Sequence, residues 1–267
     1  MTKLKTPIEV YKLLPKSNCG QCRISTCLAF AAAVIKEQKS LADCPHLAGD
    51  VLAGFEGRIE APVSLEKEQD KSLQHLKGEM ATVDFSIKAE RLGAALHGDK
   101  LVIKCLGKDF EIDQSGDIAS QCHTHAGFAL PLLSYLLRCG GANIADEWVP
   151  FRELKSGATW GALFGQRCEK PLKEIADSHT DLFGDLITIF SGRTSINKFG
   201  SDISVVLFPF PKVPMLICYW RPEDGMESKL HLFFDSTAED NLNIESIFSV
   251  GVELVSMLEK IMVKHRL

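Results

Sequence analysis

Four cysteines near the start of the chain constrain its fold and chemistry most. Two residues separate Cys19 from Cys22, four separate Cys22 from Cys27, sixteen separate Cys27 from Cys44, and Pro45 follows directly. Such clustered thiols can converge on one point, and thiolates are soft ligands that select zinc, copper(I) or iron–sulfur clusters. The spacing therefore predicts a metal or Fe–S site on Cys19, Cys22, Cys27 and Cys44, with chance clustering as the alternative.

The order of the four thiols distinguishes between the possible metals. Structural zinc sites usually present two pairs of Cys or His ligands, each pair on its own turn. This chain has one close pair, a third cysteine nearby and a lone distal Cys-Pro, which is how cubane clusters are commonly held. A cubane has irons at separate corners, so ligands arriving from separate directions suit it. The pattern favours a 4Fe-4S cluster over zinc.

The residues around the cysteines predict short helices. Thr6 and Glu9 have the spacing of a capping box, which starts a helix just before the cysteine loop. Ser25 or Thr26 can cap a second helix over residues 27–37. The N–H groups and dipole at the start of that helix favour the added negative charge of a reduced cluster. We therefore expect a small helical domain over residues 1–59.

The four cysteines and the residues around them form a longer pattern: Leu14-Pro15, Asn18-Cys19-Gly20, Cys22, Thr26-Cys27, Phe30-Ala31 and Asp43-Cys44-Pro45. This pattern resembles a known family, the small 4Fe-4S domain of the corrinoid iron–sulfur protein large subunit. Related domains occur in the B subunit of Rnf-type electron-transport complexes and in activators of corrinoid proteins. The resemblance covers about residues 7–50 and implies the four cysteines as cluster ligands.

Two positions depart from the pattern of that family. Arg23 stands where the family has a Gly, and Glu37 or Gln38 stands near the Gly that usually ends the helix. A positive charge at Arg23 could raise the potential of a cluster beside it, or the side chain could point to solvent. The departures bear on the potential of the cluster rather than on its presence.

Charge and hydropathy limit the function classes. The whole chain has 30 Lys and Arg and 35 Asp and Glu, a formal charge of −5. Residues 1–50 contain seven basic and four acidic residues, a net of +3, so the remainder carries −8. This balance argues against nucleic-acid binding, while a basic N-terminal segment could meet an acidic redox partner. We expect no membrane span and no secretory signal, hence a cytoplasmic protein.

The polar, charge-rich segment 60–78 is expected to be a linker, and residues 79–267 a larger α+β domain with a mainly antiparallel sheet. Alternation around Gly107 predicts a hairpin, Pro131 is expected to start a helix, and Pro209, Pro211 and Pro214 are expected to mark a turn. The helix candidates are residues 85–96, 131–139 and 244–263, and two further helices are expected to begin at Trp160 and Pro171. The strand candidates are residues 100–106, 108–113, 203–208, 215–220 and 229–234.

The larger domain contains few chemical signals. Five features carry a resemblance to a known family: Phe151-Arg152-Glu153-Leu154, Gly157 with Trp160, Arg167 with Pro171-Leu172, Pro211 with Pro214, and Phe234-Asp235-Ser236. They are similar to an uncharacterised family that often follows such Fe–S domains in anaerobes, and this resemblance implies architecture rather than activity. His123 and His125 are candidate axial ligands to a tetrapyrrole, either a corrinoid or a haem; the alternative is a polar loop before a helix. Arg152 and Arg167 could bind an anion. The scattered cysteines are expected to be core thiols: Cys105, Cys139, Cys168 and Cys218.

These features together predict an iron–sulfur electron-transfer or redox-partner protein of anaerobic metabolism, with corrinoid or one-carbon chemistry as the context that the resemblance implies. Its partner would be a redox protein, and a corrinoid protein is one candidate. The alternative is a corrinoid- or haem-binding module with a structural or sensory cluster. No hydrolase, nucleotide or zinc-protease motif is present, so the sequence leaves open whether the chain is an enzyme.

Overall fold

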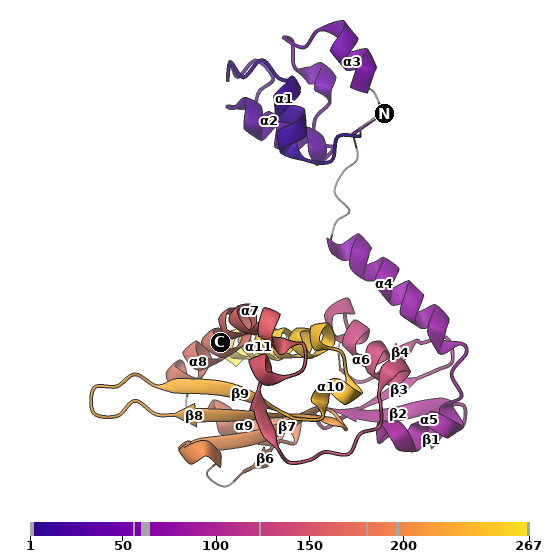
Figure 1. Ribbon diagram of the computed structural model, residues 1–267, viewed down its shortest axis with the longest axis vertical. Coiled ribbons are helices and arrows are strands. Elements are labelled where there is room, and N and C mark those ends of the chain that lie inside the picture. Colours follow the sequence, from indigo (N-terminus) through magenta and orange to yellow (C-terminus); the bar gives the residue numbers. More distant parts are fainter. Residues whose placement is uncertain are drawn as a thin grey trace. The chain divides into compact units, whose positions relative to one another are not determined.

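The computed structural model describes residues 3–55, 57–59, 65–122, 124–179, 181–195 and 198–265. The chain divides into two compact units, Met1–Glu68 and Gln69–Leu267 (Figure 1). Helix α4, Leu65–Met80, occupies most of the segment expected to be a linker. Its Lys, Glu, Gln and Leu residues are strong helix formers, and a polar composition fits an exposed helix as well as a linker.

The N-terminal unit is helical, as predicted. Thr6 Oγ1 accepts the N–H of Glu9 at 3.3 Å, and the Glu9 carboxylate accepts the N–H of Thr6 at 2.9 Å, which confirms the capping box. A parallel bridge between Leu4 and Ile59 joins the two ends of the unit. Its helices are α1 Pro7–Leu13, α2 Cys27–Ile35, the 3₁₀ helix Leu41–Asp43 and α3 Gly49–Phe55.

A small apolar core holds this unit together. Val10 of α1 packs with Phe30, Val34 and Ile35 of α2, and each of these side chains is at most 2% exposed. The buried thiols Cys27 and Cys44 belong to the same cluster. Burial of such side chains contributes roughly 1.5–3 kcal/mol each, so the cysteine loop is attached directly to the part of the unit that packing stabilises.

The second unit begins with a four-stranded antiparallel sheet. Leu106 and Gly107 form the predicted two-residue hairpin turn, and both have positive φ angles, 46° and 74°. This conformation matches the right-handed twist of the flanking strands. The order is β1-β2-β3-β4, with bounds Ala95–His97, Lys100–Cys105, Lys108–Ile112 and Ile118–Ala119.

A second, five-stranded antiparallel sheet has the order β5-β9-β8-β7-β6. The expectation that Pro209 and Pro214 belong to a turn was wrong, because they lie within β7 and β8 and only Pro211 and Lys212 connect the strands. A register shift near the end of β7 accommodates a residue that has no N–H to donate. The strands are β5 Trp148–Pro150, β6 Arg193–Thr194, β7 Ile203–Phe210, β8 Val213–Trp220 and β9 Lys229–Asp235.

Two helices end or begin away from their expected positions. Gly93, with φ of 67°, ends α5 at Leu92, and β1 follows. Helix α6 begins at Ala126, so the prediction that Pro131 starts it was wrong. Pro131 has no N–H to donate, so α6 lacks one backbone hydrogen bond. The face of α6 that contains Pro131 is buried in the core. The helices are α5 Phe85–Leu92, α6 Ala126–Arg138, α7 Gly161–Phe164, α8 Lys170–Ser178, α9 Leu182–Phe190, α10 Ala238–Asn241 and α11 Ile244–His265.

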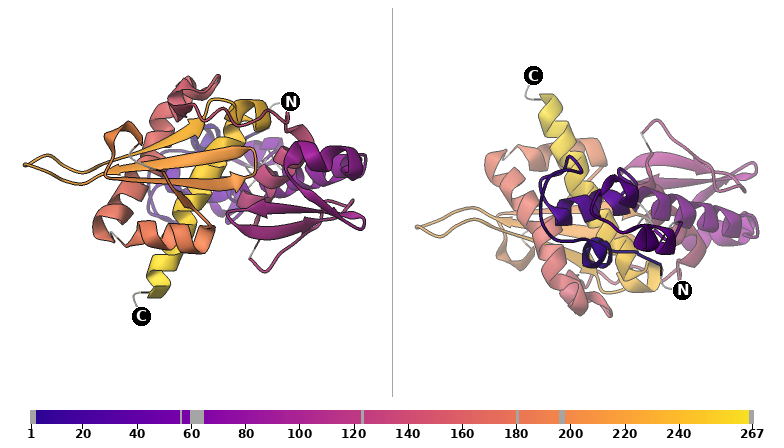
Figure 2. Two further views of the ribbon diagram at one scale, coloured as in Figure 1. Left: turned by 90° about the horizontal axis from the view of Figure 1, so that it is seen from below. Right: turned by 90° about the horizontal axis from the view of Figure 1, so that it is seen from above.

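The helices and the inner face of the five-stranded sheet share one large core. Helix α11 crosses this sheet (Figure 2), and Ile247 and Leu254 join the same buried cluster as Ile217 and Leu232. The opposite face has a thinner apolar layer around Leu216. Short turns lie at Phe151–Glu153, Gly157–Thr159, the π-helical Gly165–Glu169 and Lys198–Gly200. The described helices include none long and apolar enough to span a membrane.

Candidate metal centre

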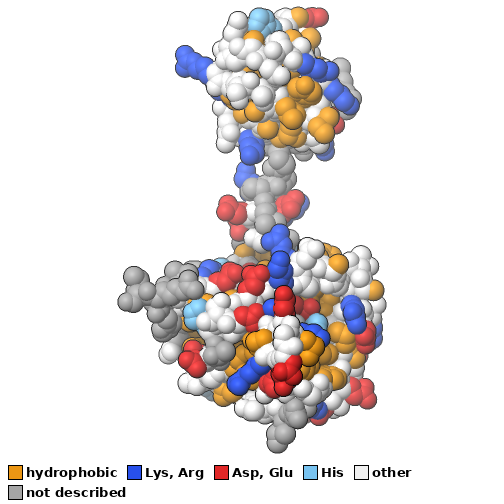
Figure 3. Space-filling view, turned by 90° about the vertical axis from the view of Figure 1, so that its left-hand side faces the viewer, with side chains coloured by type: hydrophobic (Ala, Val, Ile, Leu, Met, Phe, Trp, Pro, Cys, Tyr) orange, Lys and Arg blue, Asp and Glu red, His pale blue; other side chains and the backbone are white. Residues whose placement is uncertain are grey.

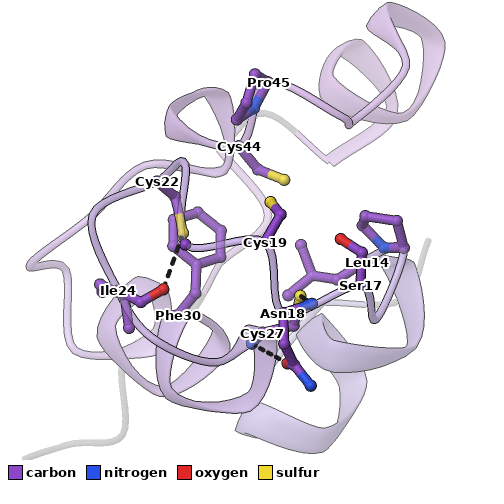
Figure 4. Close-up of a pocket in the computed structure, with 12 residues that line it drawn as sticks. Leu14, Ser17, Asn18, Cys19, Cys22, Ile24, Cys27, Phe30, Cys44 and Pro45 are labelled. Carbon is purple, nitrogen blue, oxygen red and sulfur yellow. Dashed lines mark hydrogen bonds between the residues drawn. The ribbon is translucent and has the colours of Figure 1, made fainter.

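All four clustered cysteines line one pocket of the N-terminal unit (Figure 4). Cys19 and Cys22 lie on the loop between α1 and α2, Cys27 is the first residue of α2, and Cys44 directly follows the 3₁₀ helix. Three separate segments of the chain therefore bring thiols to the same place. The other lining residues are Leu14, Pro15, Ser17, Asn18, Gly20, Ile24, Phe30 and Pro45.

The loop that carries Cys19 and Cys22 is tightly turned. Four of its residues adopt the left-handed region: Lys16 (φ 60°), Asn18 (50°), Gly20 (71°) and Arg23 (64°). Arg23 is the first departure from the family pattern that the sequence resembles, and its φ of 64° is a conformation that Gly adopts without strain.

The end of helix α2 explains the second departure from the related sequences. Glu37 has φ of 58°, its N–H donates to the Val34 carbonyl at 3.0 Å, and the Gln38 N–H donates to the Ala33 carbonyl at 2.9 Å. These two bonds form the Schellman motif, whose left-handed residue is usually Gly. Glu37 therefore holds a conformation that costs an L-residue roughly 1 kcal/mol.

Asn18 connects the loop to the first turn of α2. Its side-chain Oδ1 accepts the backbone N–H of Cys27 at 2.8 Å, and its own N–H lies 3.4 Å from Sγ of Cys27. One residue therefore caps the helix and donates a hydrogen bond to a thiol. From the sequence alone, Asn18 is only part of a matching motif; the Asn-Cys step before a Thr-Cys helix start is the signal that indicates this function.

The sulfur atoms have different surroundings. Figure 4 shows Sγ of Cys19 and Sγ of Cys44 facing one another, while Cys22 turns toward the Ile24 carbonyl, 3.8 Å from its Sγ. Two hydrogen bonds lower the pKa of Cys19. The larger effect comes from the Gln21 backbone and the smaller one from the Ser17 side chain. Cys27 and Cys44 are buried and Cys19 is exposed, so the pocket opens to solvent at Cys19.

The chemistry of this pocket fits an iron–sulfur cluster. Its donor set is four thiols, its walls are apolar, and N–H groups point at sulfur, which are the features that hold and tune such clusters. The first turn of α2 adds the positive end of a helix dipole. Among the described residues, the side chains form no group of three or more His, Cys, Asp or Glu placed to hold a single metal ion.

Of the two histidine candidates in the larger unit, the structure describes His125. His123 lies outside the described residues. His125 is the N-cap residue of α6, and its Nε2 lies 3.3 Å from Oε2 of Glu253 in α11. The assignment of either histidine as a tetrapyrrole ligand remains a prediction.

The scattered cysteines lie in the core, as expected. Cys105, Cys139, Cys168 and Cys218 are all buried. Burial raises the pKa of Cys168 to about 12 and raises that of Cys218. A high pKa suppresses the thiolate and with it the reactivity of the sulfur.

The two arginines considered as anion ligands lie in different turns of the larger unit. Arg152 is 74% exposed, and its Nε lies 3.9 Å from the Glu153 carboxylate. Its neighbour Phe151 instead stacks on Phe164 in the core, with ring centroids 4.1 Å apart. Arg167 lies in the π-helical turn before α8. The ring contacts of Phe151 are therefore packing contacts within the core.

Comparison with known families assigns both units to described sequence families. A family model described as "Putative Fe-S cluster" matches residues 14–46, and a model described as "Domain of unknown function (DUF3786)" matches residues 84–257. The second match covers more than half of the chain. No solved structure matches this chain.

Curated relatives resemble the N-terminal Fe–S segment of this chain. The acetyl-CoA decarbonylase/synthase complex subunit gamma of Methanothermobacter thermautotrophicus is 51% identical over 45 residues, which are 17% of this chain and 10% of the relative. The same subunit of Methanosarcina acetivorans is 47% identical over 45 residues, which are again 17% of this chain and 10% of the relative. The corrinoid/iron-sulfur protein large subunit of Moorella thermoacetica is 37% identical over 59 residues, 22% of this chain and 13% of the relative. The chain therefore spans only about a tenth of the length of these relatives.

Proposed function

The chain belongs to the DUF3786 family and has an N-terminal segment homologous to Fe–S domains, and from this premise we propose that it is an electron-transfer protein. Cys19, Cys22, Cys27 and Cys44 would hold a 4Fe-4S cluster. Such a cluster, when bound, supplies one-electron oxidation and reduction. The observation that supports the proposal most is that three separate segments bring all four thiols to one apolar pocket.

The residues around the thiols have distinct functions in this proposal. Asn18 holds the loop against α2 and donates its N–H to Cys27. Phe30 and Leu14 exclude water from the inner side of the pocket. Hydrogen bonds to sulfur and limited solvent exposure both set the potential of a cluster, so these residues would tune it.

The relatives indicate the metabolic context that we propose. They are subunits of an acetyl-CoA decarbonylase/synthase complex and a corrinoid/iron-sulfur protein. By homology, we place this chain in one-carbon metabolism of anaerobes, as a cytoplasmic protein that exchanges electrons with a protein partner. A corrinoid protein is the partner class that the relatives favour. The larger unit would bind that partner or a cofactor.

Anaerobic purification and spectroscopy test the cluster. The full chain, reduced with dithionite, should contain about four irons and four acid-labile sulfides and give the EPR signal of a reduced 4Fe-4S cluster. Changing Cys27→Ser or Cys44→Ser should reduce the iron content or alter the signal. Cys122→Ser is the matched control, because Cys122 is exposed and lies outside the pocket. Stoichiometric zinc without iron would contradict the proposal.

A further inference from the structure

The charges along the cysteine segment are all of one sign. Between Glu9 and Glu37 the chain has no Asp or Glu, and this interval contains three of the four clustered cysteines. Its charged residues are Lys12, Lys16, Arg23 and Lys36. The segment that would approach a cluster most closely is therefore uniformly cationic.

Two of these cations lie on the loop that carries the exposed thiol. Lys16 and Arg23 flank Cys19 in the chain, and all three are exposed. The Lys16 ammonium lies 5.6 Å from the centroid of the Tyr11 ring, which holds it near the start of the loop. The Arg23 N–H donates to the Gly20 carbonyl at 2.9 Å, so the backbone of Arg23 is fixed close to the pocket.

The carboxylates of Glu9 and Asp43 make their hydrogen bonds outside the loop of residues 15–26. The backbone N–H groups of Lys5 and Thr6 both donate to the Glu9 carboxylate, which forms part of the N-terminal cap of α1. Asp43 accepts the N–H of Ser40 at 3.0 Å and lies 3.9 Å from Lys39. Within the part of the chain that the structure describes, the Arg23 guanidinium makes no ion pair.

The solvent edge of the pocket coincides with this positive loop. Cys27 and Cys44 are buried, so Cys19 is the thiol where a bound cluster would come nearest to solvent. Leu28, in the first turn of α2, is 50% exposed and adds apolar surface. In Figure 3, the upper body is the N-terminal unit, and its visible face shows apolar side chains bordered by Lys and Arg with few Asp or Glu.

We propose that the loop of residues 15–26 is the docking surface for the acidic face of a redox protein, with the electron crossing at the Cys19 edge. This proposal rests on the proposed cluster. A bound, reduced cluster would supply one electron, the acceptor centre of the partner would gain it, and no bond or proton would change. Complementary charge accelerates such encounters and makes them sensitive to salt, and small, short-lived interfaces are typical of redox partners.

Two small one-electron oxidants of opposite charge measure the field at this edge. The dithionite-reduced full chain, freed of excess dithionite, is mixed in stopped flow with hexacyanoferrate(III) or with hexaammineruthenium(III), and bleaching of the cluster is followed. The wild-type chain should favour the anionic oxidant at low salt. In Arg23→Glu, the rate ratio of anion to cation should fall roughly tenfold or more, and the fall should shrink at 0.5 M salt.

Lys36→Glu is the control with the same change of net charge. Lys36 lies at the other end of α2, nine helical residues or about 13 Å from Cys27, which exceeds the Debye length of about 10 Å at 0.1 M salt. A change of cluster potential would alter the rates with the anionic and the cationic oxidant in the same direction. The ratio of these two rates therefore reports the charge near the cluster rather than its potential.

The outcomes separate the docking surface from the cluster itself. Iron, sulfide and EPR measurements on the same samples show whether a cluster is present. The absence of iron, sulfide and the EPR signal would overturn the proposed function. With a cluster present, an unchanged ratio in Arg23→Glu, or an equal fall in Lys36→Glu, would overturn the docking surface alone.

Discussion

The backbone N–H of Cys27 donates to Oδ1 of Asn18 at 2.8 Å, and the backbone N–H of Asn18 lies 3.4 Å from Sγ of Cys27. The two residues are nine positions apart, yet each supplies a donor to the other. The cysteine loop is thereby closed onto the first turn of α2. This closure places Cys19 and Cys22 against the helix that contains Cys27.

Substitutions of Asn18 should separate its two structural contributions. Asn18→Gly removes the acceptor for the Cys27 N–H but allows the left-handed φ of 50°. Asn18→Ala removes the acceptor and adds roughly 1 kcal/mol of backbone strain. We expect Ala to destabilise the N-terminal unit by about 2 kcal/mol and Gly by about half as much. Hydrogen exchange of the α2 amides in the full chain measures both; equal effects would show that backbone strain contributes nothing.

Glu37→Gly should stabilise the N-terminal unit. Glu37 is the left-handed residue of the Schellman motif that ends α2, and Gly adopts this conformation without strain, so the expected gain is up to about 1 kcal/mol. Slower hydrogen exchange in the last turn of α2 is the readout. Glu37→Ala removes the same carboxylate but keeps the β-carbon, and a gain as large in Ala would refute the backbone explanation.

Asp235→Asn should strongly destabilise the larger unit. The buried Asp235 carboxylate accepts the N–H groups of Ala145, Asp146 and Thr237 and the hydroxyl of Thr237, at 2.6–3.1 Å. An amide presents two N–H donors where these groups require acceptors, so we expect a loss of about 2–4 kcal/mol.

All three tryptophans lie in the larger unit, so urea unfolding followed by tryptophan fluorescence reports the stability of this unit alone. Asp202→Asn is the control, because Asp202 is exposed and accepts one N–H, from Arg221. Asp202→Asn should lower the free energy of unfolding by less than about 1 kcal/mol. Comparable losses in the two variants would contradict the importance of burial at Asp235.

The stability of the larger unit should depend on pH through Asp177. Burial opposes ionisation of this carboxyl, but hydrogen bonds from Ser228 at 2.6 Å, Lys173 at 2.9 Å and Tyr219 at 2.8 Å outweigh it and lower the pKa of Asp177 below its usual 3.8. A lowered folded-state pKa contributes stability above the unfolded value, and that contribution is lost as pH falls through the folded value.

Comparison of the wild type with Asp177→Asn isolates this contribution. The difference in free energy of unfolding should be constant from pH 7 to about pH 5 and should narrow below about pH 4. Tryptophan fluorescence in urea at each pH gives the two curves. A difference that stays constant down to pH 2 would show that the carboxylate makes no favourable ionic contacts in the folded protein.

Alkylation should distinguish the exposed cysteine of the larger unit from the core thiols. Cys122 is exposed, whereas Cys105 and Cys168 are buried, and burial raises the pKa of Cys168 to about 12. At pH 8 only roughly one Cys168 in 10⁴ would be thiolate, so iodoacetamide should modify Cys122 in the native chain and Cys168 only after unfolding. Peptide mass spectrometry locates the label; equal rates for the two cysteines would exclude a closed core.

Local patterns predicted those parts of the fold that depend on neighbouring residues. The cap at Thr6, the hairpin turn at Leu106-Gly107 and the long α11 all follow from contacts within a few positions. The start of α6 did not follow, because Pro131 is a helix-start signal in isolation. Burial of Leu132, Tyr135 and Leu136 against the core offsets the missing backbone hydrogen bond.

The sequence by itself determined that four thiols, spaced as Cys19, Cys22, Cys27 and Cys44, belong to one small helical unit, because their spacing and flanking residues are local properties. Only the tertiary structure decided which thiol faces solvent, how Asn18 closes the loop, and that Asp235 of β9 binds a loop 90 residues earlier. Those relationships join distant segments, and they depend on the packing of whole elements, which no short stretch of sequence encodes.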